Sequence, residues 1–575
     1  MRTKRLRHSH VIIAAGLAAA TLLSGSLAAV AGTNAADHGP VRARITGAAI
    51  PGSSIASAAS GPAAPAGLPS KQQQIKVLTA ALANMSKNYK TLAQSSPGVT
   101  DIYDYGIGSL WRRGIDGAGT TIAVIEGWDL PSIGQIVSGF DQQLGLPDPQ
   151  IQTIFPAGPL PAQCPPGMVK LGSYGSCSAW GGELALDVIT AHLIAPYAKI
   201  VISATPADTE VSDDAASQVA PPEMMEALEQ ISRQHLANVI SISDDTGETT
   251  YSYGRAEILA QDPGELAAAA AGVPVLVASG DCGVVQNLAV ANGQCQDTSG
   301  TPDTAAWDDS PWVTAVGGSV PNFSATGQRL GPDPVWHQGV FSEGAGFSSV
   351  FTRPAYAGGV AAVTGSPMRS VPDITMDAQD GTSEATPMLA GVLALATQVN
   401  RGNVGPINPA LYRVLGPAGA RDGIADVVAG DNSVTHGSTV IVPGFTAGPG
   451  FDVASGWGTL YAPRFVPSLV EATRAAGQDA AARQQARAQL AALASRSIRL
   501  SRTSTGDFYL LAGGFLPTHP VALAVDGQPV AKLTANSLGD VTYMIDPALL
   551  QLAAGHHAIT LTSMLITEQA AFTSG

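Results

Sequence analysis

The sequence predicts an α/β fold: a doubly wound, mostly parallel sheet followed by a small C-terminal β-sandwich. Between residues 101 and 473, short apolar runs of strand length alternate with helical patterns, which is typical of a parallel sheet covered by helices. From residue 499 onward the chain changes to short apolar runs separated by turns such as Asp526-Gly527 and Gly539-Asp540. Regular strand and turn spacing of that kind indicates an immunoglobulin-like sandwich over residues 499–575.

The N-terminus reads as a secretory signal peptide over residues 1–31. Basic residues within positions 1–7 precede an apolar stretch at 11–30, and residues 29–31 form an A-x-A cleavage site. A membrane anchor is the alternative, but the apolar stretch is interrupted by Ser24, Gly25 and Ser26, and no other long apolar segment follows. We therefore expect a secreted, extracellular protein without a membrane span.

Residues 32–100 are expected to form a linker with one short helix. The stretch up to about residue 69 is rich in Ala, Gly, Ser and Pro, and it lacks a periodic apolar pattern. Apolar residues then recur at helical spacing between Lys71 and Ala93. We expect no full prodomain in this region.

Four buried strands can be placed in the main domain, which we expect to span residues 101–473. They are Thr120–Glu126, Lys199–Ala204, Val239–Ser243 and Val273–Ser279. Helical patterns at Pro222–Leu236 and Glu265–Ala271 lie between them, and an Ala/Gln/Arg-rich helical linker is expected at 474–498.

Charge and cysteine content exclude some classes of function. The 575 residues carry a net charge of −15 with only 13% charged residues, which disfavours binding to nucleic acid or anionic membranes. The cysteines fall into two local pairs, and in an exported chain we expect two short disulfides, Cys164–Cys177 and Cys282–Cys295.

Ser383 is the candidate nucleophile. It stands in Gly381-Thr382-Ser383, just before a long apolar stretch that predicts a buried helix. A serine at a helix N-terminus lies near free backbone N–H groups, which suit an attacking oxygen and a developing oxyanion. A simple helix cap is the alternative for this short motif alone.

Glu183 and Asp187 are candidate proton carriers. They lie four residues apart on one face of a helix predicted over residues 179–195, and no Lys or Arg shares that face. Burial among apolar residues would leave at least one carboxyl neutral or hydrogen-bonded, so the pair could share a proton. Two solvated surface acids are the alternative.

Asp281 is the candidate oxyanion donor, in Ser279-Gly280-Asp281-Cys282-Gly283. It follows a strand, at the sheet edge where ligands bind in open α/β folds. An ordinary Asx turn is the alternative.

Together these motifs resemble the sedolisin family, the serine-carboxyl peptidases that share the subtilisin fold, over residues 101–470. The resemblance implies that Ser383 is the nucleophile, Glu183 its base, Asp187 the support of Glu183, and Asp281 the oxyanion donor. It also implies one calcium ion, held by carboxylates of Asp426 and Asp452 and by backbone carbonyls. The matching segments are Asp426-Val427 and Gly448-Pro449-Gly450-Phe451-Asp452, so the expected ligands are Asp426, Val427, Gly448, Gly450 and Asp452.

Subtilisin itself is the nearest rival, because it also has a G-T-S-x-x-x-P serine. It would need an Asp soon after the first strand and an H-G-T histidine, but the strand here ends Ile125-Glu126-Gly127 and no HGT exists. His192 lies five residues after Asp187, so it projects elsewhere and is expected to be a packed or rim histidine.

The expected function is therefore a secreted, acid-active serine-type peptidase that acts as a monomer on polypeptides, as an endopeptidase or a tripeptidyl-peptidase. The alternative is a catalytically weak relative that binds an extracellular partner through its C-terminal β-domain. The unusually short segment between Pro372 and Ser383 motivates that alternative.

Overall fold

The computed structural model describes residues 67–95, 98–156, 160, 177–205, 222–244, 246–251, 254–286, 295, 301–322, 331–436, 439–476, 478–503, 506–516, 519–536, 539–563 and 566–574. All of them belong to the unit Ala64–Gly575. The predicted signal peptide, the linker as far as residue 66, and Cys164 lie outside these residues.

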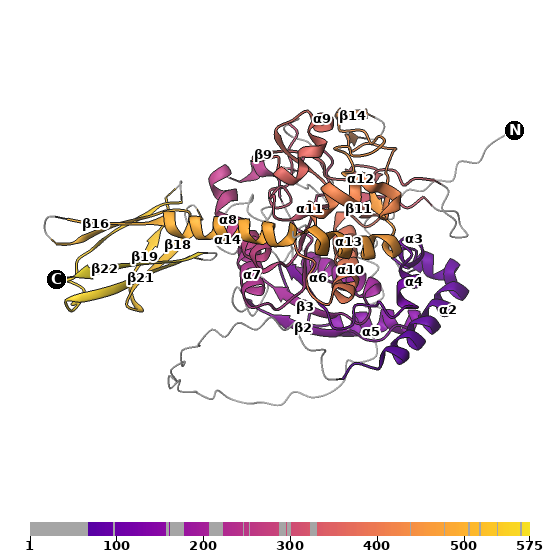
Figure 1. Cartoon of the computed structure of the whole chain (residues 1–575), viewed down its shortest axis with the longest axis horizontal. Helices are drawn as coiled ribbons and strands as arrows, with labels where there is room; N and C mark the ends of the chain where they lie inside the picture. Colours follow the sequence, from indigo (N-terminus) through magenta and orange to yellow (C-terminus); the bar gives the residue numbers. More distant parts are fainter. Residues whose placement is uncertain are drawn as a thin grey trace. The chain divides into compact units, whose positions relative to one another are not determined.

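A seven-stranded sheet forms the centre of the main domain, in the order β11-β6-β5-β4-β1-β3-β2 (Figure 1). Every neighbouring pair in it is parallel, which confirms the predicted fold class. The strands are β1 Thr121–Glu126, β2 Gln150–Ile154, β3 Lys199–Ala204, β4 Val239–Ile242, β5 Val275–Ala278, β6 Thr314–Ser319 and β11 Ile374–Asp377.

Helices cover both faces of this sheet. Alternate residues of β1 point into two different cores: Ile122 and Val124 pack with α6 and α10, whereas Ala123 and Ile125 pack with α7. Figure 1 shows α6 and α10 side by side near the middle of the domain, and they are in contact. The helices next to the sheet are α5 Ile133–Leu144, α6 Cys177–Ile194, α7 Pro222–Arg233, α8 Arg255–Ala271 and α10 Thr382–Asn400.

Strands β2 and β6 were not predicted, for two different reasons. β2 is an edge strand with polar residues such as Gln150 and Gln152, so it lacks an apolar run. β6 contains Gly317 and Gly318, which weaken a strand pattern. A Cβ at Gly317 would lie 2.5 Å from the Glu343 carboxyl, so tertiary packing requires glycine there.

The segment before residue 101 contributes to the main core. The predicted helix appears as α2 Lys71–Ser95, and it buries Leu78, Leu82 and Met85. Two short helices follow it, α3 Asp101–Asp104 and α4 Ile107–Trp111.

The later part of the main domain consists mostly of short elements, and two longer helices follow them. They are β9 Gly346–Thr352, α9 Ala361–Thr364, β10 Met368–Val371, α11 Asn408–Ala410, α12 Gly416–Ala418, β12 Ile424–Ala425, β13 Val434–His436, β14 Thr439–Val442, β15 Thr459–Leu460, α13 Ala462–Ala476 and α14 Gln478–Ser497. The single helix expected at 474–498 is thus the end of α13 and all of α14.

Two antiparallel sheets follow α14, in the orders β16-β17-β20 and β19-β18-β21-β22. Phe508 and Leu510 of the first sheet share one apolar core with Leu523 and Leu561 of the second. This two-sheet arrangement agrees with the predicted C-terminal β-sandwich. The strands are β16 Ile498–Arg502, β17 Phe508–Ala512, β18 Pro520–Val525, β19 Gln528–Thr534, β20 Val541–Ile545, β21 Gly555–Ser563 and β22 Ile566–Ser574.

Across the described parts of the chain, none of the helices combines the length and the apolar character that a bilayer crossing requires.

A buried ion pair holds the segment that leads into β11. Arg369 donates to both carboxylate oxygens of Asp373 at 2.7 and 2.6 Å, and Arg369 is only 1% exposed. Tyr412 donates to the same carboxylate at 2.6 Å, and the Ala315 N–H on β6 donates at 2.9 Å. Asp373 thus ties β6, β10 and β11 together.

We predict that Arg369→Met lowers the free energy of unfolding by about 3–5 kcal/mol, because it leaves the Asp373 carboxylate buried without its cation. Urea denaturation measures this change. Arg421→Met is the matched control, since Arg421 is exposed in its pair with Asp422 and should contribute at most about 1 kcal/mol. Equal effects of the two substitutions would contradict this assignment.

Candidate active site

Ser383 lies at the N-terminus of α10, at the carboxyl edge of the sheet. Gly381 precedes the helix with φ 96°, a conformation that favours glycine, and a Cβ there would meet Asp281 Oδ2 at 2.7 Å. Ser383 is half-buried, and its Oγ donates weakly to the Ser243 carbonyl at 3.4 Å. The turn therefore brings the predicted nucleophile directly beside the loop that follows β5.

Asp281 occupies that loop. Its Oδ1 accepts hydrogen bonds from the backbone N–H and the hydroxyl of Thr382, both at 2.8 Å. The predicted Cys282–Cys295 disulfide is confirmed, and it braces the loop. Burial raises the pKa of Asp281, although the bonds from Thr382 lower it in part. Because Oδ1 is engaged, a proton on this carboxyl would lie on Oδ2.

Glu183 and Asp187 enter the site from α6, one turn apart. The pKa of Glu183 is raised to about 7: burial is the largest cause, a hydrogen bond with the Ser383 side chain opposes it, and the charges of Asp281 and Asp380 add to the increase. Asp187 is fully buried and accepts a hydrogen bond from Ser243 Oγ at 2.8 Å. Burial and the charge of Glu183 raise the pKa of Asp187 well above its usual range. The structure thus brings together all four predicted catalytic residues.

Glu126 was not predicted as part of the site. It ends β1, is fully buried, and interacts with Asp187. Burial raises its pKa well above the usual value, and the charges of Asp187 and Glu183 raise it further. A carboxyl at the end of an otherwise apolar buried strand was the signal that could have identified it.

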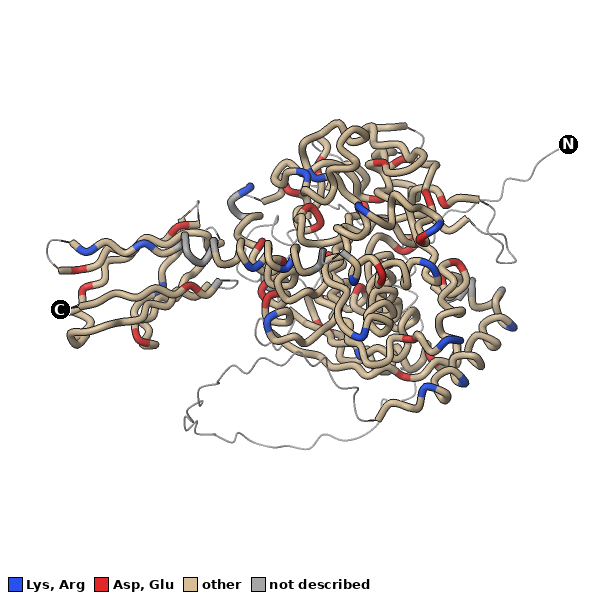
Figure 2. The backbone as a smooth tube through the Cα atoms, in the orientation of Figure 1, with Lys and Arg blue, Asp and Glu red and all other residues tan. Residues whose placement is uncertain are grey.

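No cation balances these acids among the residues that the structure describes: none of the observed ion pairs includes Glu126, Glu183, Asp187 or Asp281. Figure 2 shows that Lys and Arg are sparse along the described backbone. Carboxyls buried without cations lower their charge by keeping protons. The three acids Glu126, Asp187 and Glu183, called here the acid set, therefore share protons at a pH where isolated carboxyls are ionised.

His192 takes no part in the site. It is fully buried on α6, and its Nε2 lies 3.0 Å from Asp141 Oδ1 on α5. The expectation of a packed histidine is confirmed. Within the described ranges, Cys177 is disulfide-bonded, but its predicted partner Cys164 lies outside them.

The short connection from Pro372 to Ser383 leaves the sheet intact. β11 pairs in register with β6 from Ile374 to Asp377, and Thr382 keeps its two bonds to Asp281. The segment that motivated the binding-protein alternative therefore does not disturb the turn at the nucleophile.

The predicted calcium ligands gather around one loop. The Gly450 N–H donates to Asp426 Oδ2 and the Gly448 N–H donates to Asp452 Oδ2, both at 2.8 Å. Asp426 Oδ1 is buried without a hydrogen-bond partner, which is the kind of atom that a cation would satisfy. No cluster of three or more His, Cys, Asp or Glu side chains suited to a metal occurs in the described part of the chain. A cation here would thus depend on two carboxylates and on backbone carbonyls.

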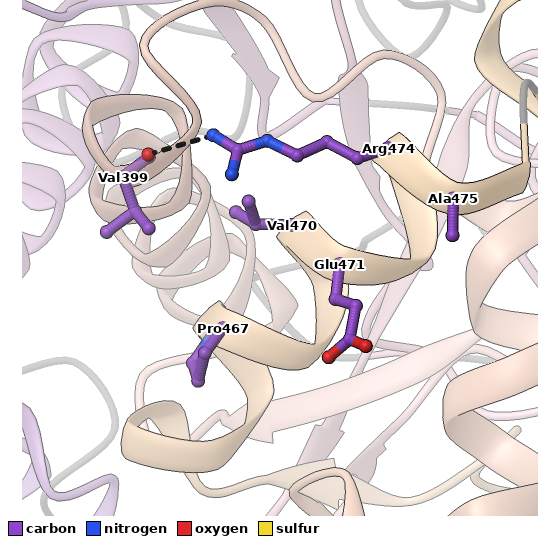
Figure 3. Close-up of a pocket in the computed structure, with 6 residues that line it drawn as sticks. All are labelled: Val399, Pro467, Val470, Glu471, Arg474 and Ala475. Carbon is purple, nitrogen blue, oxygen red and sulfur yellow. Dashed lines mark hydrogen bonds between the residues drawn. The ribbon is translucent and has the colours of Figure 1, made fainter.

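A groove of about 430 Å³ lies away from this site, between the end of α10 and α13 (Figure 3). Its lining residues are Val399, Pro467, Val470, Glu471, Arg474 and Ala475. Val399 and Ser383 are at opposite ends of α10, about 24 Å apart at a rise of about 1.5 Å per residue. This groove is therefore not part of the candidate active site.

Comparison with known proteins identifies relatives of this arrangement. The chain is 28% identical over 392 residues to kumamolisin of Bacillus sp. (strain MN-32), covering 62% of this chain and 61% of kumamolisin. Human tripeptidyl-peptidase 1 is 29% identical over 240 residues, covering 35% of this chain and 38% of that protein. The solved Pseudomonas sedolisin, a serine-carboxyl proteinase complexed with two molecules of pseudo-iodotyrostatin, matches with 25% identity and a TM-score of 0.50 over 63% of this chain and 94% of its own.

The chain belongs to the sedolisin family of serine-carboxyl peptidases. No family model matches the sequence. This sedolisin relative spans about three fifths of the length of kumamolisin, and less of tripeptidyl-peptidase 1.

We predict that the melting temperature of this sedolisin relative falls as the pH rises from about 4.5 to about 7. A carboxyl whose pKa is raised in the folded state stabilises the fold while it keeps its proton, and that stabilisation is lost as pH rises through the folded pKa, which for Glu183 is about 7. Differential scanning calorimetry over this range measures the effect. Glu183→Gln cannot ionise, so it should show a shallower decline; a slope as steep as that of the wild type would contradict the shifted Glu183.

Proposed function

We propose that this protein is a secreted, acid-active serine-carboxyl peptidase that hydrolyses peptide bonds in polypeptides. The observation that carries the proposal is the hydrogen bond between the Ser383 side chain and the Glu183 carboxyl, next to an Asp281 carboxyl that Thr382 holds in place. Membership of the sedolisin family supports the same chemistry. The proposal leaves endopeptidase and tripeptidyl-peptidase action open.

In the proposed mechanism, Ser383 Oγ attacks the peptide carbonyl carbon while Glu183 takes the hydroxyl proton. The tetrahedral intermediate then expels the amine, which leaves with the proton from Glu183, and an acyl ester remains on Ser383. Water attacks this ester with Glu183 again as base, and the acid product and free Ser383 result. Asp187 and Glu126 share the proton that Glu183 gains, through the hydrogen-bonded carboxyls of the acid set.

Asp281 is proposed to stabilise the oxyanion. A proton on Oδ2 can be donated to the developing negative charge, whereas an ionised Asp281 would repel it. Burial favours the protonated form, and Thr382 holds the carboxyl in place through Oδ1. This role limits the enzyme to acidic conditions.

One calcium ion is proposed to bind the loop of Asp426 and Asp452, together with the carbonyls of Val427, Gly448 and Gly450. The ion would supply charge neutralisation for two carboxylates whose pKa values are raised by burial. Oxygen-only ligands suit Ca²⁺. Its role is structural, because it stabilises the loop rather than the reacting groups.

We predict that Ser383→Ala abolishes cleavage of denatured casein in mild acid and leaves the melting temperature nearly unchanged. The substitution removes the nucleophile, a long 3.4 Å hydrogen bond to the Ser243 carbonyl and the hydrogen bond with Glu183, but no apolar packing, since the Ser383 side chain carries only a hydroxyl. Gel electrophoresis of the casein and calorimetry of the variant measure the two effects. Activity at the wild-type level would remove Ser383 from the mechanism.

The pH–rate profile is expected to be bell-shaped, with an alkaline limb set by Asp281. Asp281→Asn keeps a hydrogen-bond donor that does not ionise, so its alkaline limb should move to higher pH even if its maximal rate falls. Initial rates on a fluorogenic peptide across the acid range measure both limbs. A wild-type rate that rises through neutrality to a plateau would instead indicate a histidine base and contradict the serine-carboxyl mechanism.

Removal of calcium with EDTA should lower the melting temperature and the activity together, because the ion binds only the folded state. Asp452→Ala should reproduce the effect and should no longer respond to EDTA. Asp422→Ala, which replaces an aspartate of the exposed pair with Arg421, serves as the control. An unchanged melting temperature in both the EDTA and the Asp452→Ala measurements would show that the calcium assignment is wrong.

A further inference from the structure

Ser243 is a residue of the site to which the proposed mechanism assigns no task. It directly follows β4, which neighbours β1 and β5 in the centre of the sheet, and it is 7% exposed. In the strand order of the sheet, the next two strands along the chain, β2 and β3, lie on one side of β1, whereas β4 lies on its other side. Ser243 therefore lies at the topological switch point of the sheet.

The contacts of Ser243 join the two helices that carry the reacting groups. Its Oγ lies 2.8 Å from Asp187 Oδ2 on α6 and 3.3 Å from the backbone oxygen of Ser383 on α10. Its own carbonyl accepts the 3.4 Å hydrogen bond from Ser383 Oγ.

Ser243 has a single hydroxyl proton, so it can donate a full hydrogen bond to only one of these two oxygens. A distance of 2.8 Å is normal for an O–H···O bond, whereas 3.3 Å is long, so the proton is donated to Asp187. Apart from the side-chain hydrogen bond that Asp187 shares with Glu126, Asp187 Oδ1 has no donor among the described residues. The bond from Ser243 thus occupies Oδ2 and leaves Oδ1 as the oxygen through which Asp187 shares a proton with its acidic neighbours.

The geometry points to Ser243 as a positioning residue for the proposed reaction: its hydroxyl fixes the Asp187 carboxyl and favours ionisation of the acid set at the acidic working pH. The groups that face Asp187 are Glu183 from α6 and Glu126 from β1, both acidic, so Ser243 is the neutral donor that opposes them. The other charged groups that act on the acid set are also acidic: Asp244 acts on Glu126, and Asp281 and Asp380 act on Glu183. The inference rests on the proposed function and adds a residue to it.

Loss of the Ser243 hydroxyl should shift the ionisation of the acid set in a defined direction. A hydrogen bond to a carboxylate stabilises its ionised form, so removing the bond raises the pH at which the acid set loses its first proton. In Ser243→Ala, the acid limb of the pH–rate profile should move to higher pH, while the alkaline limb, set by Asp281, stays in place. Loss of one hydrogen bond to a charged group also corresponds to about a ten- to hundred-fold fall in kcat.

The experiment compares kcat and KM across pH for the wild type, Ser243→Ala, Ser243→Thr and Ser241→Ala. Thr keeps the hydroxyl and should restore the wild-type acid limb. Ser241 is the matched control: it is a fully buried serine of β4 whose Oγ has no hydrogen-bond partner among the described residues. Ser241→Ala should therefore leave both limbs unchanged.

A Ser243→Ala profile that coincides with that of Ser241→Ala would overturn the inference, while an active wild type and an inactive Ser383→Ala would leave the proposed function standing. Infrared difference spectra of the carboxyl C=O band across pH give a second readout that needs no turnover. In them, Ser243→Ala should keep its carboxyl protons to higher pH than the wild type and Ser243→Thr. An inactive wild type would contradict the proposed function alone. Identical spectra of all variants would contradict the role of Ser243.

Discussion

Burial of several carboxyl groups in one place without a cation is the constraint on which the rest of the site depends. Glu126 and Asp187 are fully buried, and Glu183 is half-buried beside them. An isolated buried carboxylate is costly, and three close ones repel each other, so the set keeps protons that exposed carboxyls would lose. A carboxyl of raised pKa beside Ser383 and a protonated neighbour behind it both follow from this one arrangement.

The fold creates the arrangement by bringing five chain segments together at one edge of a parallel sheet. Glu126 ends β1, Ser243 follows β4, and Asp281 lies in the loop after β5. The N-terminus of α10 places Ser383 over the same edge, and α6 adds Glu183 and Asp187. The buried pair of Arg369 with Asp373 fixes the approach to β11, the strand that precedes the nucleophile turn. The Arg369 cation thus stabilises the segment that leads to the nucleophile. Among the described residues, no cation forms an ion pair with the acid set.

Much of this could be predicted from the sequence, because the relevant signals are local. The strands β1, β3, β4 and β5 are continuous apolar runs, and the spacing of Glu183 and Asp187 places them on one helical face. The Cys282–Cys295 disulfide followed from the short loop between the cysteines. The catalytic roles and the calcium ligands remain predictions.

The residues that were missed depend on contacts distant in sequence. Glu126 gains its role only when β1 lies beside α6, and nothing in the local sequence shows that its carboxyl meets Asp187. Ser243 was read as the last residue of a strand, although its hydroxyl reaches two helices. β6 was hidden because Gly317 and Gly318 are required by side chains that pack against the strand from elsewhere in the chain.

Potentiometric difference titration of the folded protein tests the central claim most directly. The wild type is compared with a variant in which Glu126, Asp187 and Glu183 are replaced by Gln, Asn and Gln, and folding of both is checked by circular dichroism. Ordinary carboxyls titrate near about pH 4. The account predicts that the wild type releases more protons than the variant at pH values well above this, and that part of this release extends to about pH 7. Titration curves that coincide above about pH 5 would show that the three carboxyls are ionised like exposed ones, and would contradict the account.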